Sequence, residues 1–206
     1  MVYAIVFVVL VVLLRVVFRF EHYGKDILDS YKTNGRPYIL CPNHISAVDP
    51  LLVIITRGTG RKLTVMAKEE LFKNKFFGWF LGQLGAIPVA RGTGDKDVLE
   101  KTIEDIQKGA GVMIFPEGTR GNGNEMGRLK SGAFAVAAQT GADLIPVRII
   151  YHTADGNMKP FCKATVAVGQ PLTIEQTQLD NGQRQQIRIA KAMLEESYAK
   201  LLEEYK

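Results

Sequence analysis

Short apolar runs of the kind that form buried strands alternate along this chain with segments of helical spacing. The expected strands lie at residues 38–41, 63–68, 112–115, 144–151 and 164–168. The expected helices lie at residues 50–55, 95–108, 131–140 and 183–206. Apolar runs of about four to eight residues suit strands that are covered on both faces. The alternation of the two kinds of element therefore predicts an α/β fold.

The length and composition of the chain predict one domain with a substantial core. The chain has 206 residues, and 47% of them are hydrophobic. We expect this domain to cover residues 21–206, behind a separate apolar segment at residues 1–20. The two cysteines, Cys41 and Cys162, are too few for a disulfide framework. Both stand in apolar surroundings, which is typical of small buried residues in a reducing compartment.

The first residues of the chain form an apolar segment. Residues 1–14 carry no charge, Arg15 interrupts the run and Arg19 closes it. A bilayer span needs about 20 apolar residues, and Arg15 is near enough to the end to reach the head groups. We expect a membrane anchor helix at residues 1–20, with a buried core helix as the alternative. The positive-inside bias then places the domain on the cytoplasmic face of the cell membrane.

One polar pattern, at residues 43–49, indicates catalysis. It puts the imidazole of His44 five positions before the carboxylate of Asp49. A histidine oriented by a carboxylate is the general-base half of a catalytic triad. No serine or cysteine stands in a recognisable nucleophile elbow, so the base is expected to activate a hydroxyl group of the substrate. Pro50 suits the first turn of a helix, and we expect Asp49 to be its N-cap as well as the partner of His44.

A second polar motif follows the apolar run at residues 112–115. Here the sequence continues Pro116-Glu117-Gly118-Thr119-Arg120, where the chain must turn. A polar loop at the end of a buried strand is a common place for an active site in α/β proteins. The two motifs are therefore expected to meet at one edge of the sheet.

Together, Asn-His-x4-Asp at residues 43–49 and Phe-Pro-Glu-Gly-Thr-Arg at residues 115–120 resemble the glycerolipid acyltransferases, specifically the 1-acylglycerol-3-phosphate (lysophosphatidate) acyltransferases. Two shorter blocks, at residues 85–91 and 144–147, occur in the family's order. The resemblance runs from about residue 38 to residue 170, and Pro88 stands where a bulkier apolar residue is frequent. It implies a central mixed sheet flanked by helices, as in glycerol-3-phosphate acyltransferase.

The resemblance also implies a reaction. A fatty acyl group would pass from acyl-CoA or acyl carrier protein, the co-substrate, to the free sn-2 hydroxyl of lysophosphatidate, giving phosphatidate for phospholipid biosynthesis. His44 would take the hydroxyl proton, and Asp49 would hold the imidazole and stabilise the imidazolium. The chemistry needs no metal and no other cofactor.

The phosphate of such an acceptor needs cations. Arg91 and Arg120 are the expected partners because a guanidinium can bind phosphate oxygens bidentately, and Lys68 is a third candidate. Glu117 is expected to accept a hydrogen bond from an acceptor hydroxyl or to organise the arginines. From the same loop, Gly118 and Thr119 would contribute backbone N–H groups or a hydroxyl.

Charge and aromatic residues point to a lipid partner. The chain carries a net charge of +5, and basic residues gather from 57 to 75, where Arg57, Arg61, Lys62, Lys68, Lys73 and Lys75 face only Glu69 and Glu70. No nucleic-acid motif is present, so anionic head groups and a phosphate-bearing substrate explain the patch better. Residues 71–84 combine aromatic residues with lysines, which suits the head-group boundary, core packing or the wall of an acyl-chain groove.

Several alternatives remain open from the sequence. Cys41 is three residues from His44 and could form a Cys–His nucleophile, and Ser46 could form an acyl-enzyme in a two-step reaction. The acceptor could be glycerol-3-phosphate or another lysophospholipid. A hydrolase and a non-catalytic membrane lipid-binding module are the remaining readings. No His-x3-His or Cys-x2-Cys pair indicates a zinc site.

Overall fold

The computed structural model describes residues 11–206, apart from residues 13, 15–16, 61–62, 90–94 and 175–180. Most of the expected anchor at residues 1–20 lies outside the described residues. Within the described part of the chain, no helix is both long and apolar enough to cross a bilayer. Residues 19 and 20 already belong to strand β1 (Arg19–Tyr23), so the expected domain boundary falls inside this strand.

Seven strands form one mixed sheet in the order β1-β7-β6-β2-β5-β3-β4. Strands β6 and β7 pair antiparallel, whereas the other neighbouring strands pair in parallel. This confirms the central mixed sheet that the family resemblance implies. The bounds of the strands after β1 are β2 Tyr38–Pro42, β3 Leu63–Lys68, β4 Ala86–Val89, β5 Gly111–Met113, β6 Asp143–Tyr151 and β7 Lys163–Val168.

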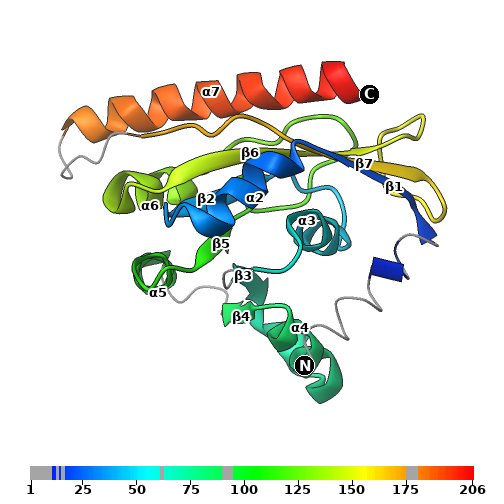
Figure 1. Ribbon diagram of the computed structural model, residues 1–206, viewed down its shortest axis with the longest axis horizontal. Helices are drawn as coiled ribbons and strands as arrows, with labels where there is room; N and C mark the ends of the chain where they lie inside the picture. The colour runs from blue at the N-terminus through cyan, green and yellow to red at the C-terminus, as the bar shows by residue number, and fades with distance from the viewer. Residues whose placement is uncertain (1–10, 13, 15–16, 61–62, 90–94, 175–180) are drawn as a thin grey trace.

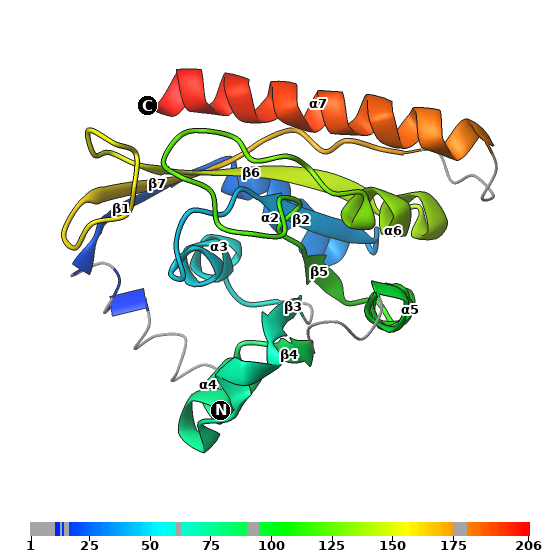
Figure 2. The same cartoon turned by 180° about the vertical axis from the view of Figure 1, so that it is seen from behind.

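Helices cover both faces of the sheet (Figures 1 and 2). On one face lie α2 (Lys25–Thr33) and α3 (Asp49–Arg57), and on the other lie α5 (Asp95–Gln107), α6 (Gly132–Thr140) and α7 (Asn181–Tyr205). A short 3-10 helix, η1 (Glu69–Phe72), and α4 (Lys75–Gln83) project beside β3 and β4. The central sheet with helices on both faces is the predicted α/β architecture.

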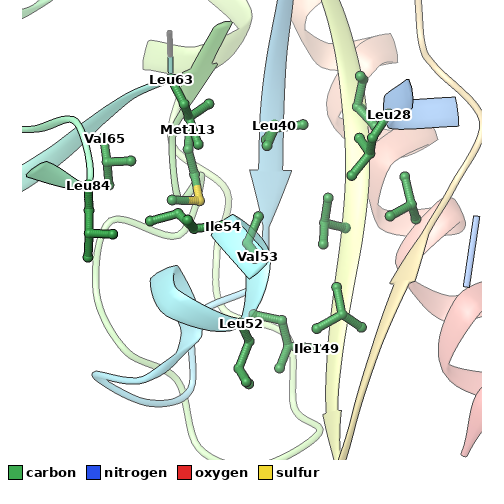
Figure 3. Packing of buried hydrophobic residues seen from close by; sticks show 14 of the residues in the cluster. Leu28, Leu40, Leu52, Val53, Ile54, Leu63, Val65, Leu84, Met113 and Ile149 are labelled. Carbon is green, nitrogen blue, oxygen red and sulfur yellow. The ribbon is translucent and has the colours of Figure 1, made fainter. Parts of the chain in front are cut away.

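Side chains of alternate strand residues point to opposite faces of the sheet and form part of two apolar cores. Figure 3 shows the core under α3, where Leu52, Val53 and Ile54 pack against Leu40 and Ile149 of the sheet. The core on the other face gathers side chains from β2, β5 and β6 beneath α6 and α7. Full burial of one such aliphatic side chain contributes about 1.5–3 kcal/mol, so the sheet is rigidly held at its centre.

The expected strands and helices are confirmed with small shifts at their ends, and the differences are local. Strand β5 is shorter than expected because Ile114 and Phe115 leave the strand and enter the loop that carries Glu117. Strand β1 and helix α2 were not predicted. Their sequence from residue 19 to residue 33 mixes charged and apolar residues with no clean strand period, and tertiary packing of Leu28 and Tyr31 decides their structure.

Candidate active site

Two loops meet at the carboxyl edge of the sheet. Strand β2 runs in parallel with β5, so the residues that follow each strand leave from the same edge. Asn43 fixes the first loop to β6, since its side chain accepts a hydrogen bond from the N–H of Ile149 at 2.6 Å and donates one to the same residue's carbonyl at 3.2 Å. The next residue, His44, is thereby held at the sheet edge.

The imidazole of His44 pairs with the carboxylate of Asp49. Their Nδ1 and Oδ2 atoms are 2.9 Å apart, the His44 side chain is 19% exposed, and the Asp49 side chain is fully buried. A carboxylate only accepts hydrogen bonds, so Nδ1 carries the proton and Nε2 is left to act as a base. Phe115 packs on the imidazole with a ring-centroid distance of 4.1 Å and restricts its rotation.

The carboxylate of Asp49 is held by the turn that precedes helix α3. Besides His44, its Oδ2 atom accepts hydrogen bonds from the backbone N–H groups of Ile45, at 2.6 Å, and Ser46, at 2.7 Å. The expectation that Asp49 is the N-cap is wrong: the helix begins at Asp49, the cap position is Val48, and no side-chain cap bond forms. Instead, the carboxylate accepts hydrogen bonds from residues that precede it in the chain. These bonds hold residues 44–49 in one compact turn.

Tyr151 is a fourth donor to Asp49, and the sequence did not reveal it. Its hydroxyl donates to Oδ1 of Asp49 at 2.6 Å, from the last residue of β6. Burial is the main cause, and the nearby carboxylate of Asp49 the next largest cause, of a pKa of Tyr151 well above its ordinary value. The phenol therefore stays protonated and donates. The carboxylate is therefore fixed from both sides, with Oδ2 facing the imidazole.

Glu117 joins the two loops. The residue is 5% exposed, its Oε1 atom accepts a hydrogen bond from the backbone N–H of His44, and its Oε2 atom accepts one from the N–H of Gly127, both at 3.0 Å. The carbonyl of His44 in turn accepts a hydrogen bond from Gly121 at 2.7 Å. A Cβ atom at Gly127 would lie 2.5 Å from the Glu117 carboxylate, so a larger residue there would displace this carboxylate. Through these contacts, the side chain of Glu117 bridges the two loops and holds them together.

The three residues that follow Glu117 in the motif lie at the surface. Gly118, Thr119 and Arg120 are exposed and follow Glu117 directly. Gly118 has φ of 69°, and Lys130 stands so close that a Cβ atom at Gly118 would lie 2.6 Å from its Nζ atom. Lys130 is thus a cation beside this loop that the sequence motifs did not indicate.

The other two expected phosphate partners, Lys68 and Arg91, stay predictions. Lys68 is the last residue of β3, separated from β2 by β5. Its side chain is outside the described part of the chain. Arg91 lies entirely outside the described residues. The structure thus brings His44, Asp49 and Glu117 together, with Arg120 following in the same loop.

A buried arginine near Glu117 was also not predicted from the sequence. Arg148 of β6 is 2% exposed, and its Nη2 atom donates to the carbonyl of Asn124 at 2.8 Å. Its guanidinium lies 5.8 Å from the ring centre of Tyr198 and within electrostatic reach of Glu117. The positive charge of Arg148 offsets the buried carboxylate and ties down the loop through residue 124.

The two nucleophiles considered from sequence have other surroundings. Cys41 is fully buried in the core beneath α6 and α7, and burial raises the pKa of its thiol above the ordinary value. A thiol in such a place is a poor nucleophile because the thiolate is the reactive form. Ser46 is 7% exposed, and its hydroxyl accepts a hydrogen bond from the N–H of Val48 within the turn.

Substitution of Glu117 with glutamine tests its bridging role. Glutamine keeps the shape but presents an N–H group to a backbone donor and removes the charge that faces Arg148. We expect a loss of about 2–4 kcal/mol in the free energy of unfolding, seen as a fall of about 5–15 °C in Tm by thermal denaturation. The exposed Glu125 of the same loop is the matched control, and Glu125→Gln should leave Tm unchanged. An unchanged Tm in Glu117→Gln, with only a higher KM for an acceptor, would instead show contact with substrate.

The fold is α/β, and the site places a carboxylate-backed imidazole at the carboxyl edge of parallel strands, an arrangement that suits general-base chemistry. Comparison with known proteins identifies the group within this class. A family model described as Acyltransferase matches residues 19–150, which is more than half of the chain. The chain therefore belongs to the acyltransferase family.

Individual relatives agree with the family assignment. The chain is 30% identical over 135 residues to a chloroplastic 1-acyl-sn-glycerol-3-phosphate acyltransferase of Brassica napus, a match that covers 64% of this chain and 38% of that protein. It is 32% identical over 138 residues to the 1-acyl-sn-glycerol-3-phosphate acyltransferase of Bacillus subtilis, which covers 66% of each. The chain thus spans well under half the length of the Brassica relative.

A solved structure shares the fold. The 1-acyl-sn-glycerophosphate acyltransferase from Thermotoga maritima matches with a TM-score of 0.65 at 22% identity. The match covers 91% of this chain and 72% of that chain. The α/β fold with a mixed sheet flanked by helices is therefore shared with the matched part of that protein.

Proposed function

We propose that this chain transfers a fatty acyl group from an acyl thioester to the free sn-2 hydroxyl of lysophosphatidate, forming phosphatidate. The observation that carries the proposal is the His44–Asp49 pair, held at 2.9 Å and backed by Tyr151. Membership of the acyltransferase family and the names of the two relatives support the reaction class and the acceptor. Acyl-CoA and acyl carrier protein are the two candidate donors.

The proposed reaction proceeds by direct transfer. The Nε2 atom of His44 takes the hydroxyl proton as the acceptor oxygen attacks the thioester carbonyl. Asp49 keeps Nδ1 protonated and stabilises the imidazolium that forms. The tetrahedral intermediate then expels the thiolate, which receives the proton from the imidazolium. The products are the ester and the free thiol, and no acyl-enzyme forms.

Cations beside the Glu117 loop are proposed to bind the phosphate of the acceptor. Arg120 is exposed three residues after Glu117, and Lys130 lies against Gly118. A guanidinium and an ammonium on one loop suit a phosphate monoester. Arg91 and Lys68 remain proposed partners on the basis of the sequence motifs.

Residues 1–20 are proposed to anchor the domain to the cytoplasmic face of the cell membrane. The support is their uncharged, apolar start and the arginines at 15 and 19. An anchored domain would meet an acceptor that is itself a membrane lipid.

Acyl transfer by the purified full chain in detergent tests the proposed function. Lysophosphatidate is the acceptor, and acyl-CoA and acyl carrier protein are supplied in separate reactions. Phosphatidate that forms with either donor supports the proposal and identifies the donor. If neither donor yields phosphatidate, while glycerol-3-phosphate or another lysophospholipid is acylated, the acceptor is wrong. Release of free fatty acid alone would indicate a hydrolase.

A further inference from the structure

Helix α4 has one face packed on the domain and one face left open. Phe80 and Leu81 pack partly against the core that lies under α3, and Leu84, just after the helix, is 3% exposed. On the open face, Phe76 is 76% exposed and Trp79 is 48% exposed, with their ring centres 6.1 Å apart. Two large aromatic side chains that touch each other and leave the core form an exposed apolar patch, which we call the α4 patch.

The α4 patch lies on the part of the molecule that projects from the sheet. Figures 1 and 2 both show α4 on the side of the sheet opposite α7. Helix η1 begins directly after Lys68, the last residue of β3. Strands β3, β5 and β2 are parallel neighbours, so η1 leaves the same edge of the sheet as the loop of His44, about 10 Å along it. The chain that leads into α4 therefore starts at the active-site edge.

Positive charge borders the aromatic pair. Lys73 lies in the link from η1 and Lys75 is the first residue of α4, and both are exposed. The helix has no acidic residue in its first turn. Glu69 and Glu70 are exposed too, but they precede Phe72 in η1. The aromatic rings of the patch therefore have cations beside them. Side chains of these two kinds together are typical of protein segments that bind at the boundary between head groups and acyl chains.

We infer that the α4 patch docks on the surface of a bilayer that contains anionic lipid. Phe76 and Trp79 enter the head-group boundary, and Lys73 and Lys75 face the lipid phosphates. This deepens the proposed function and rests on it, because docking through α4 would turn the active-site edge toward a lipid acceptor. It also gives the domain a membrane contact of its own, separate from residues 1–20.

The chain carries its own probe for this contact, because Trp79 is its one tryptophan. The full chain is titrated with phosphatidylglycerol–phosphatidylcholine vesicles while its emission is recorded. We expect a blue shift and quenching by lipids brominated near the head group. Sedimentation of the protein with vesicles, with emission unshifted and unquenched, would mean that another segment binds the membrane and would overturn the inference. A blue shift that depends on protein concentration without lipid would show that a second copy covers α4, and would overturn it too.

Variants separate the patch from the rest of the surface. Phe76→Ser keeps the tryptophan and should weaken vesicle partitioning at least about tenfold. Lys73→Gln should weaken binding to anionic vesicles about fivefold and leave binding to pure phosphatidylcholine nearly unchanged. The matched control is Ile189→Ser, since Ile189 is 53% exposed on α7, away from α4. Partitioning of Phe76→Ser equal to that of the native chain would contradict the inference.

Turnover distinguishes this inference from the proposed function. With lysophosphatidate dispersed in detergent, Phe76→Ser should form phosphatidate at the native rate, because the patch holds no reacting group. With the acceptor in vesicles, the same variant should be slower by about the factor lost in partitioning. If the native chain docks through Trp79 and makes no phosphatidate in either form, the proposed function fails and the docking surface stands.

Discussion

Replacement of His44 with alanine is expected to lower kcat for the proposed reaction, formation of phosphatidate, at least about a hundredfold and to leave KM for the acceptor nearly unchanged. General-base catalysis by a positioned imidazole contributes about 10²–10⁴ in rate, and its loss is felt in the transition state more than in the bound substrate. The measurement is steady-state acyl transfer with the donor that serves the native chain.

The structure predicts that His44→Ala still folds. The bonds that join this residue to Glu117 and Gly121 are made by its backbone N–H and carbonyl, which alanine retains. The carboxylate of Asp49 keeps its donors Ile45, Ser46 and Tyr151. The Tm should stay close to the native value. His22→Ala, on the exposed part of β1, controls for loss of an imidazole elsewhere. Full activity in His44→Ala would remove the base from the mechanism.

The sequence could predict the His44–Asp49 pair because the pair is local. Five positions separate the residues, and backbone N–H groups between them bind the same carboxylate. Much of the sheet was predictable for a similar reason. Strands that are buried on both faces read as apolar runs, as β2 does and as β6 does apart from Asp143 and Arg148.

Contacts between distant segments could not be read from the sequence. Tyr151 lies 102 positions from Asp49, and nothing in the sequence around either residue signals the other. The role of Glu117 was not foreseen for the same reason, since its two backbone partners come from different loops. Strand β1 also depends on a distant segment, because it pairs with β7 near the other end of the chain. These features are set by tertiary packing, which local patterns do not encode.

Asp49→Asn is expected to lower kcat about a thousandfold or more while the protein remains folded. The amide oxygen can accept the three hydrogen bonds from His44, Ile45 and Ser46 that Oδ2 accepts now. The amide N–H then points to the hydroxyl of Tyr151, which can rotate and accept it. The geometry survives, but the negative charge that stabilises the imidazolium is gone, and loss of this charge is costly in triads of the same design. Steady-state kinetics and a thermal melt together make the measurement.

Tyr151→Phe is the matched control for this charge, because it removes one donor to Asp49 and leaves the carboxylate. Its loss of kcat should be no more than about tenfold, the worth of one hydrogen bond to a charged group. The double variant Asp49→Asn, Tyr151→Phe should melt lower than the sum of the single effects, because the buried amide N–H then has lost its acceptor. If Asp49→Asn keeps more than about a tenth of native activity, the carboxylate serves the turn before α3 and not the imidazole. If it unfolds while Tyr151→Phe does not, the turn depends on the charge, and Asp49→Glu with native folding and low kcat would still reveal the orienting role.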